Sequence, residues 1–188
     1  ALIHPFLSEL FDELARQPAF LEAVQAIRLG EPANISIGGP SLTAQAVLAV
    51  LLQRAVDRPV LVIAPNSASV DVLLNAAEAV DDLLGPQAQR VGPLALPAHD
   101  VTPFDGLSPH ADVSEKRGIA LWRLAHGSAS VVVAPIASAL IKTAAPAFVR
   151  NLAWSISIGD EFFLEDLEAG LAAVGYVRHE PVEMAGQF

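Results

Sequence analysis

A polar segment near the middle of the chain contains residue types that bind metals or activate water. His99, Asp100, Asp105, His110 and Asp112 together offer two imidazoles and three carboxylates. Such groups are common ligands of zinc and other divalent metals. Their spacing, however, puts no two of them at the i, i+4 positions of one helix face, and no recognised metal motif results. The pattern therefore does not predict a metal site.

The same segment places a serine near histidine and aspartate, which are the components of a nucleophilic triad. The G-x-S-x-G turn that marks many such hydrolases is missing. We instead expect Asp105 and Ser108 to make turn and cap hydrogen bonds, and Pro103 and Pro109 to stiffen the loop. A hydrolase, either phosphate-loop-like or metal-dependent and using the His99–Asp112 loop, is the alternative interpretation.

A glycine-rich turn beginning at Gly38 lies between a predicted strand and a predicted helix, which is where nucleotide-binding proteins carry a phosphate loop. That loop needs the pattern G-x-x-x-x-G-K-[ST]. Counting from Gly38, Thr43 stands for the second glycine, Ala44 for the lysine and Gln45 for the serine or threonine. Pro40 also lacks the backbone N–H that a phosphate cradle would use. The turn therefore predicts a degenerate phosphate loop, and we expect no nucleotide, cofactor or metal.

The composition indicates a globular protein with a sizeable core. The chain has 188 residues, 53% of them hydrophobic, and no cysteine. The missing cysteines exclude disulfides, thiol catalysis and cysteine-ligated zinc, and fit a cytoplasmic protein. No apolar run reaches the roughly 18 residues that a membrane span needs. The acidic start of the chain does not resemble a signal peptide, and no membrane association is expected.

The charge balance argues against direct binding of nucleic acid. The formal net charge is −10, with only eleven lysines and arginines. Proteins that bind nucleic acids cluster positive charge against the phosphates. Here the densest basic group is Lys116, Arg117 and Arg123 on one predicted helix, and we expect Arg117 and Arg123 to lie on a solvated face or to pair with Glu115 or Asp112. Any role near DNA would run through another protein.

The hydrophobic pattern predicts an α/β fold, with a parallel sheet covered by helices on both faces. Residues 1–30 predict two amphipathic helices. The predicted strands that follow are Ile35–Ile37, Val60–Ala64, Leu94–Leu96 and Ser130–Ala134. The predicted helices between and after them are Leu42–Arg54, a helix capped by Ser67 and running to Leu84, Val113–His126 and Ser138–Thr143.

The pattern changes after Pro146 and predicts part of a small α+β domain. Its expected elements are a strand at Trp154–Ile158, a helix at Phe163–Val174 and a strand at Tyr176–Val182. Fewer than forty residues follow a boundary near Asn151, too few for an independent core. We therefore expect this second domain to be incomplete.

The order of parts around the central loop resembles one family. A strand ends in Leu-Pro, a loop of the form aromatic-Asp-x-x-Ser-Pro-His follows, and a helix with an arginine comes next. The residues at these positions are Phe104, Asp105, Ser108, Pro109, His110 and Arg117. This order resembles the bacterial transcription-repair coupling factors. The family usually has Trp-Glu after the Leu-Pro-x opening, where this chain has His99-Asp100.

The C-terminal residues carry a second resemblance, to coupling factors and to the excinuclease B subunit. Both show a strand ending in Gly-x-x, a helix, Gly-Tyr with an arginine nearby, and then Gly-x-Phe. Here Gly175-Tyr-Val-Arg178 and Gly186-Gln-Phe188 match that order. In those families this domain docks the excinuclease A subunit through arginines. The resemblance thus implies that Arg178 and Phe188 contribute to partner binding, while residue types alone equally allow Arg178 to neutralise Glu180 or Glu183.

The resemblance implies two domains and a role. It runs from about Ile35 to Phe188 and implies a RecA-like domain that binds no nucleotide at 31–150 and a partial partner-docking domain at 151–188. The helical extension at residues 1–30 is predicted from periodicity alone. The whole protein would be an ATP-driven DNA translocase that displaces stalled RNA polymerase. This part would catalyse nothing and would contact the excinuclease A subunit and other domains of its parent, with RNA polymerase and DNA reached only through the parent. An excinuclease B subunit fits less well, because that subunit needs an intact phosphate loop.

Overall fold

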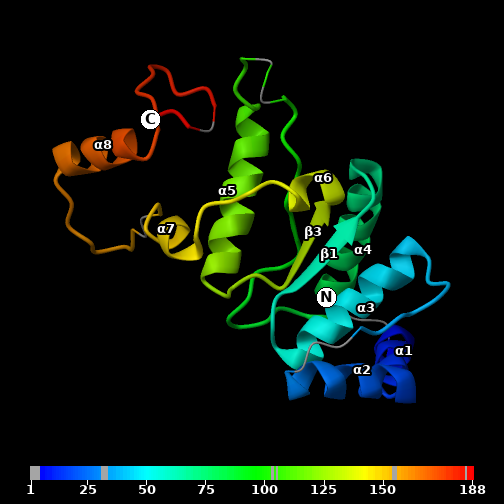
Figure 1. The fold of residues 1–188 in the computed structure, drawn as a ribbon. Helices are drawn as coiled ribbons and strands as arrows, with labels where there is room; N and C mark the ends of the chain where they lie inside the picture. Colours follow the sequence, from blue (N-terminus) through cyan, green and yellow to red (C-terminus); the bar gives the residue numbers. More distant parts are fainter. Residues whose placement is uncertain (1–4, 31–33, 103, 105, 154–155, 185) are drawn as a thin grey trace.

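The computed structural model describes residues 5–30, 34–102, 104, 106–153, 156–184 and 186–188 (Figure 1). Three parallel strands form one sheet in the order β1-β3-β2. They are β1 (Val60–Ala64), β3 (Val131–Pro135) and β2 (Leu94–Ala95). Helices join consecutive strands, so the predicted α/β class with a parallel sheet is confirmed.

The central strand β3 organises the core from both of its faces. All five of its residues are buried, and Leu61 of β1 stands opposite Val132 in the register. Val131 and Val133 belong to the cluster of buried residues under α3 (Leu42–Val56) and α4 (Ser67–Leu84), while Val132 and Ala134 belong to a cluster under α5. A strand covered on both faces needs a continuous apolar run, which this one has.

The first face of the sheet carries the larger core. Helices α1 (Pro5–Ala15) and α2 (Pro18–Leu29) add Phe11, Phe20 and Val24 to the cluster that contains α3 and α4. Asn66, not Ser67, caps α4, accepting a hydrogen bond from the Ser69 N–H at 2.9 Å. The two predicted N-terminal helices are thus present and pack into the main core.

The second face is covered by α5 (Ala111–Ala125). Its Ala120 is fully buried against a cluster that includes Leu96 and Val132. The short α6 (Ile136–Ala139) follows β3 directly, and α7 (Pro146–Arg150) contacts α5. Residues 96–110 connect β2 to the first turn of α5.

The C-terminal part is built differently. Among the described residues from 139 to 188, none is buried. It contains α8 (Leu164–Ala173), which ends in a left-handed turn at Gly175, with φ of 97°. Tyr176 N–H donates to the Leu171 carbonyl, and Gly175 N–H donates to the Ala172 carbonyl. This pair of hydrogen bonds is the Schellman motif, and it turns the chain back toward α8.

Several predicted elements differ from the structure. Residues 35–37 form no strand and are exposed, since they are not paired with the sheet that would bury them. Residues 156–158 form no strand either, and Trp154 and Ser155 lie outside the described residues. The predicted strand Tyr176–Val182 reduces to one bridge between Val177 and Gln187. Helix α6 begins before the predicted helix Ser138–Thr143 and overlaps only its first residues, because it ends at Ala139. The domain boundaries near residues 30 and 150 stay predictions.

Candidate functional site

The loop after β2 is closed at its base by Asp100. Its Oδ1 and Oδ2 accept a hydrogen bond from His110 N–H at 3.1 and 3.3 Å. His110 Nδ1 in turn accepts from Asp112 N–H at 3.3 Å and caps α5. Among the described residues of the loop, Asp100 and His110 thus accept these bonds. The predicted role of Asp105 lies outside the described residues, and Ser108 is exposed.

The described residues at the tip of this loop include two exposed apolar side chains. Phe104 and Leu107 are 97% and 69% exposed. Among the residues that the structure describes, no group of three histidines, aspartates or glutamates is placed to hold a metal ion.

Arg117 corrects one expectation from the sequence. It is 5% exposed rather than solvated, and it pairs with neither Glu115 nor Asp112. Its Nη1 donates to the Pro97 carbonyl at 2.5 Å and to Ser138 Oγ at 2.6 Å, and Ser138 donates to the same carbonyl at 3.0 Å. The guanidinium thus ties α5 to the segment that follows β2 and to α6. Burial lowers the pKa of Arg117, although an arginine stays charged at neutral pH.

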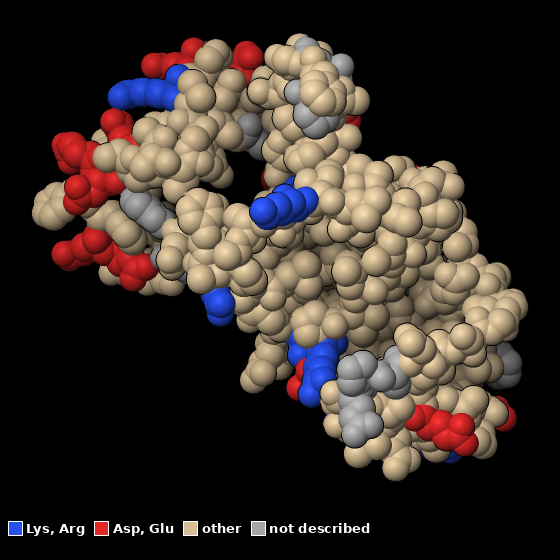
Figure 2. Space-filling model, in the orientation of Figure 1, with Lys and Arg blue, Asp and Glu red and all other residues tan. Residues whose placement is uncertain are grey.

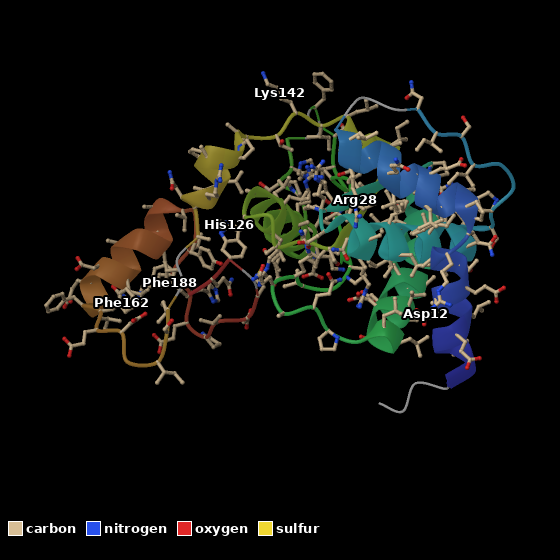
Figure 3. All side chains as sticks on the ribbon, turned by 90° about the horizontal axis from the view of Figure 1, so that it is seen from below. Asp12, Arg28, His126, Lys142, Phe162 and Phe188 are labelled. Carbon is tan, nitrogen blue, oxygen red and sulfur yellow. The ribbon has the colours of Figure 1, made fainter. Side chains whose placement is uncertain are left out.

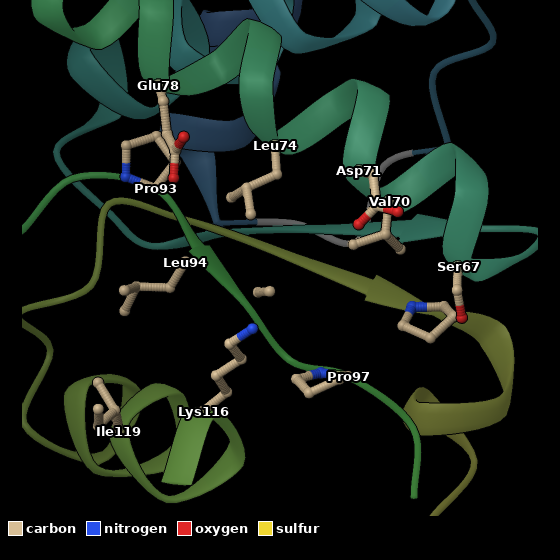
Figure 4. Close-up of a pocket in the computed structure, with 12 residues that line it drawn as sticks. Ser67, Val70, Asp71, Leu74, Glu78, Pro93, Leu94, Pro97, Lys116 and Ile119 are labelled. Atoms are coloured by element: carbon tan, nitrogen blue, oxygen red, sulfur yellow. The ribbon is translucent and has the colours of Figure 1, made fainter. Parts of the chain in front are cut away.

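A groove of roughly 330 Å³ runs between α4 and α5 along the edge of the sheet (Figure 4). Leu74 and Ile119 lie on its two walls, with Asp71 and Glu78 on the α4 side and Lys116 on the α5 side. The β2 edge between these walls is bounded by Pro93 and Pro97. Because proline lacks the backbone N–H, this edge is a poor template for an added strand.

The glycine-rich turn before α3 uses its polar groups internally. Ser41 Oγ accepts a hydrogen bond from Ala44 N–H at 3.3 Å, which caps the helix. The Gln45 side-chain amide donates to the Pro40 carbonyl at 3.1 Å. Ala44 and Gln45 occupy the positions where a phosphate loop has lysine and serine or threonine. One amide of the first turn is therefore already satisfied by a side chain.

The two residues that resemblance assigns to partner binding lie close together. Phe188 N–H donates to the Val177 carbonyl at 3.1 Å, and His179 N–H donates to the Phe188 carbonyl at 3.0 Å. Arg178 stands between these two bonded residues. Figure 3 shows Phe162 and Phe188 at one end of the molecule and Asp12 at the other. The C-terminal segment thus presents Arg178 and Phe188 on one short hydrogen-bonded element.

The charge around Arg178 is strongly acidic. Residues 151–188 contain seven acidic side chains and one arginine, and Figure 2 shows red side chains gathered over the part of the molecule that contains α8. Arg178 Nη1 lies 3.3 Å from Glu168 Oε2, and the two side chains are 75% and 37% exposed. Its partner is therefore neither Glu180 nor Glu183, the two that the sequence suggested. Proximity along the chain favours those residues, whereas the Gly175 turn brings Arg178 beside α8.

Comparison with known proteins shows what this chain is similar to. No protein-family model matches it. The chain is 28% identical over 172 residues, 90% of its length, to a transcription-repair-coupling factor of Myxococcus xanthus. It is 25% identical over 93 residues, half of its length, to a transcription-repair-coupling factor of Haemophilus influenzae. The resemblance to the coupling factors is therefore confirmed. The aligned parts make up only 14% and 8% of those two proteins.

Among the described helices, none is both long and apolar enough to cross a lipid bilayer.

The features that sequence analysis missed are the burial of Arg117, the Asp100–His110 closure and the contact made by Glu168. The coupling-factor pattern includes an arginine at the position of Arg117, but it does not indicate that this side chain is buried. Nothing in the sequence pattern pointed to Glu168, whose contact depends on how the chain turns after α8.

Proposed function

We propose that this chain is a protein-interaction module of a transcription-repair coupling factor, and that it docks the excinuclease A subunit through its C-terminal segment. The observation that carries the proposal is the exposed Arg178 beside Phe188 on one bonded element. An exposed arginine can form bidentate, charge-assisted hydrogen bonds with a partner carboxylate. The similarity to coupling factors supports the choice of partner.

The α/β body would serve as a scaffold. Its parallel sheet supports a RecA-like domain, and the turn at residues 38–41, which lacks the lysine, supports a degenerate phosphate loop that binds no nucleotide. The parent protein would be the ATP-driven translocase that displaces stalled RNA polymerase in the cytoplasm. A second role, restraint of that motor through contacts with other domains of the parent, would use the same exposed surfaces.

Calorimetric titration of the 188-residue chain with purified excinuclease A subunit tests this function. We expect binding by the wild type, binding weakened about tenfold or more by Arg178→Ala, and no change for the exposed control Arg150→Ala. Magnesium-ATP, titrated separately, should give no binding heat. Saturable ATP binding would instead support the hydrolase alternative, and equal affinities for the wild type and Arg178→Ala would exclude Arg178 from the interface.

A further inference from the structure

In the free chain, Glu168 forms an ion pair with the Arg178 guanidinium. The proposed function assigns the same guanidinium to a carboxylate of the partner. A single donor–acceptor contact joins Arg178 to Glu168, from Nη1 to Oε2 at 3.3 Å. A guanidinium presents five N–H donors in a planar fork, so this contact uses little of its capacity. Two parallel bonds to one carboxylate are both shorter and stronger than such a contact. The pair is therefore weak enough to be exchanged.

The fold holds Glu168 near Arg178 independently of any partner. The Schellman turn at Gly175 reverses the chain after α8, and the bonds of Val177 and His179 to residues 186–188 fix the direction of the returning segment. Arg178 consequently runs back beside the helix that carries Glu168. Glu168 is also the more buried of the two side chains, so its position is better defined than that of the arginine.

From this geometry we infer that Glu168 competes with the docking partner for Arg178, and that a partner carboxylate replaces it when the complex forms. The inference rests on the proposed function and adds its regulation. It also defines the chemistry of the partner surface. Because six further acidic side chains lie in residues 151–188, the incoming carboxylate must be flanked by basic residues, or like-charge repulsion would oppose docking.

The effect should be modest, because an exposed ion pair contributes little free energy. Removing the competitor with Glu168→Gln keeps the shape of the side chain and removes its charge. We expect this variant to bind the excinuclease A subunit about two- to fivefold more tightly than the wild type. The gain should disappear when Arg178→Ala is also present, because nothing then remains for Glu168 to occupy.

The experiment measures the affinity of the excinuclease A subunit for the wild type, the two single variants and the double variant by calorimetry. Glu165→Gln is the matched control, since it removes one exposed carboxylate from the same helix outside the ion pair. This control should bind as well as the wild type or more weakly. Tighter binding by Glu168→Gln alone supports the competition.

Two other results would overturn the inference in distinguishable ways. If Glu168→Gln binds no more tightly than the wild type while Arg178→Ala binds more weakly, the competition is wrong and the docking site stands. If no form binds, the proposed function fails and the inference fails with it. The NMR signals of the Arg178 Nη–Hη groups in the free chain check the ion pair itself, and their hydrogen exchange should accelerate in Glu168→Gln. Unchanged exchange would show that the pair does not form in solution.

Discussion

The sheet with its helices and the segment after residue 139 are two contrasting regions of one chain. In the first, β3 is wholly buried and helices cover both of its faces. In the second, none of the described residues is buried, and turns and an exposed ion pair define the shape. The difference separates two kinds of effect. Substitutions in the first region should change stability, and those in the second should change binding.

Truncating a core leucine should show the largest effect. Leu73 of α4 is 1% exposed, whereas Leu164 of α8 is 65% exposed. We expect Leu73→Ala to lower the free energy of unfolding by about 2–5 kcal/mol, because it removes buried methyl groups and leaves a cavity. Leu164→Ala should change it by less than about 0.5 kcal/mol. Urea denaturation of both variants measures this, and equal losses would break the comparison between the two regions.

Removing the buried guanidinium of Arg117 should have the second-largest effect on the free energy of unfolding. Arg117→Ala leaves the Pro97 carbonyl and the Ser138 hydroxyl without their charged donor, and we expect a loss of about 2–3 kcal/mol. Arg123, whose guanidinium lies 4.8 Å from the Trp122 ring, serves as the control on the same helix. Arg123→Ala should cost no more than about 1 kcal/mol. A smaller loss for Arg117→Ala than for Arg123→Ala would contradict the structural role of Arg117.

These two cases also show how far the sequence could predict the fold. The limits of β1 and the last residue of α4 were predicted to the residue, and the start of α4 and both ends of α8 to within one residue. Continuous apolar runs and helical periodicity are local signals, so they can be recognised in the sequence without knowing the tertiary contacts. The burial of Arg117 has no local signal, because its two acceptors lie 20 and 21 residues away.

The candidate site was predicted only in part. Arg178 and Phe188 came from a motif resemblance, and their closeness depends on hydrogen bonds between segments that a strand pattern does not specify. The predicted strand Tyr176–Val182 was wrong for most of its length, since a single bridge is all the pairing that its described residues make. Alternation of apolar and polar residues indicates a half-buried strand only where a partner strand is present.

Removing the Asp100 carboxylate at the base of the central loop should have an intermediate effect on the free energy of unfolding. Asp100→Ala removes the carboxylate that accepts the His110 N–H, and we expect a loss of about 1 kcal/mol. Asp12 of α1 is exposed and serves as the control. Thermal unfolding of both variants should show a lower midpoint for Asp100→Ala alone. An unchanged midpoint would mean that the loop base is held by other contacts.

The smallest effect on stability should come from the candidate docking residue. Arg178 is exposed and singly paired, so Arg178→Ala should alter the free energy of unfolding by less than about 0.5 kcal/mol. The same variant should lose about tenfold or more in affinity for the excinuclease A subunit. Urea denaturation and calorimetry on one preparation compare the two quantities. A large loss of stability would show that Arg178 contributes to folding as well as to binding.

The most direct test of the account is amide hydrogen exchange across the whole chain, with and without the excinuclease A subunit. Exchange reports local opening and therefore separates a docked segment from an unchanged core. The account predicts that binding slows exchange in residues 163–188 and leaves α3, α4 and β3 unchanged. Slower exchange in the sheet and its helices, with none in the C-terminal segment, would contradict it.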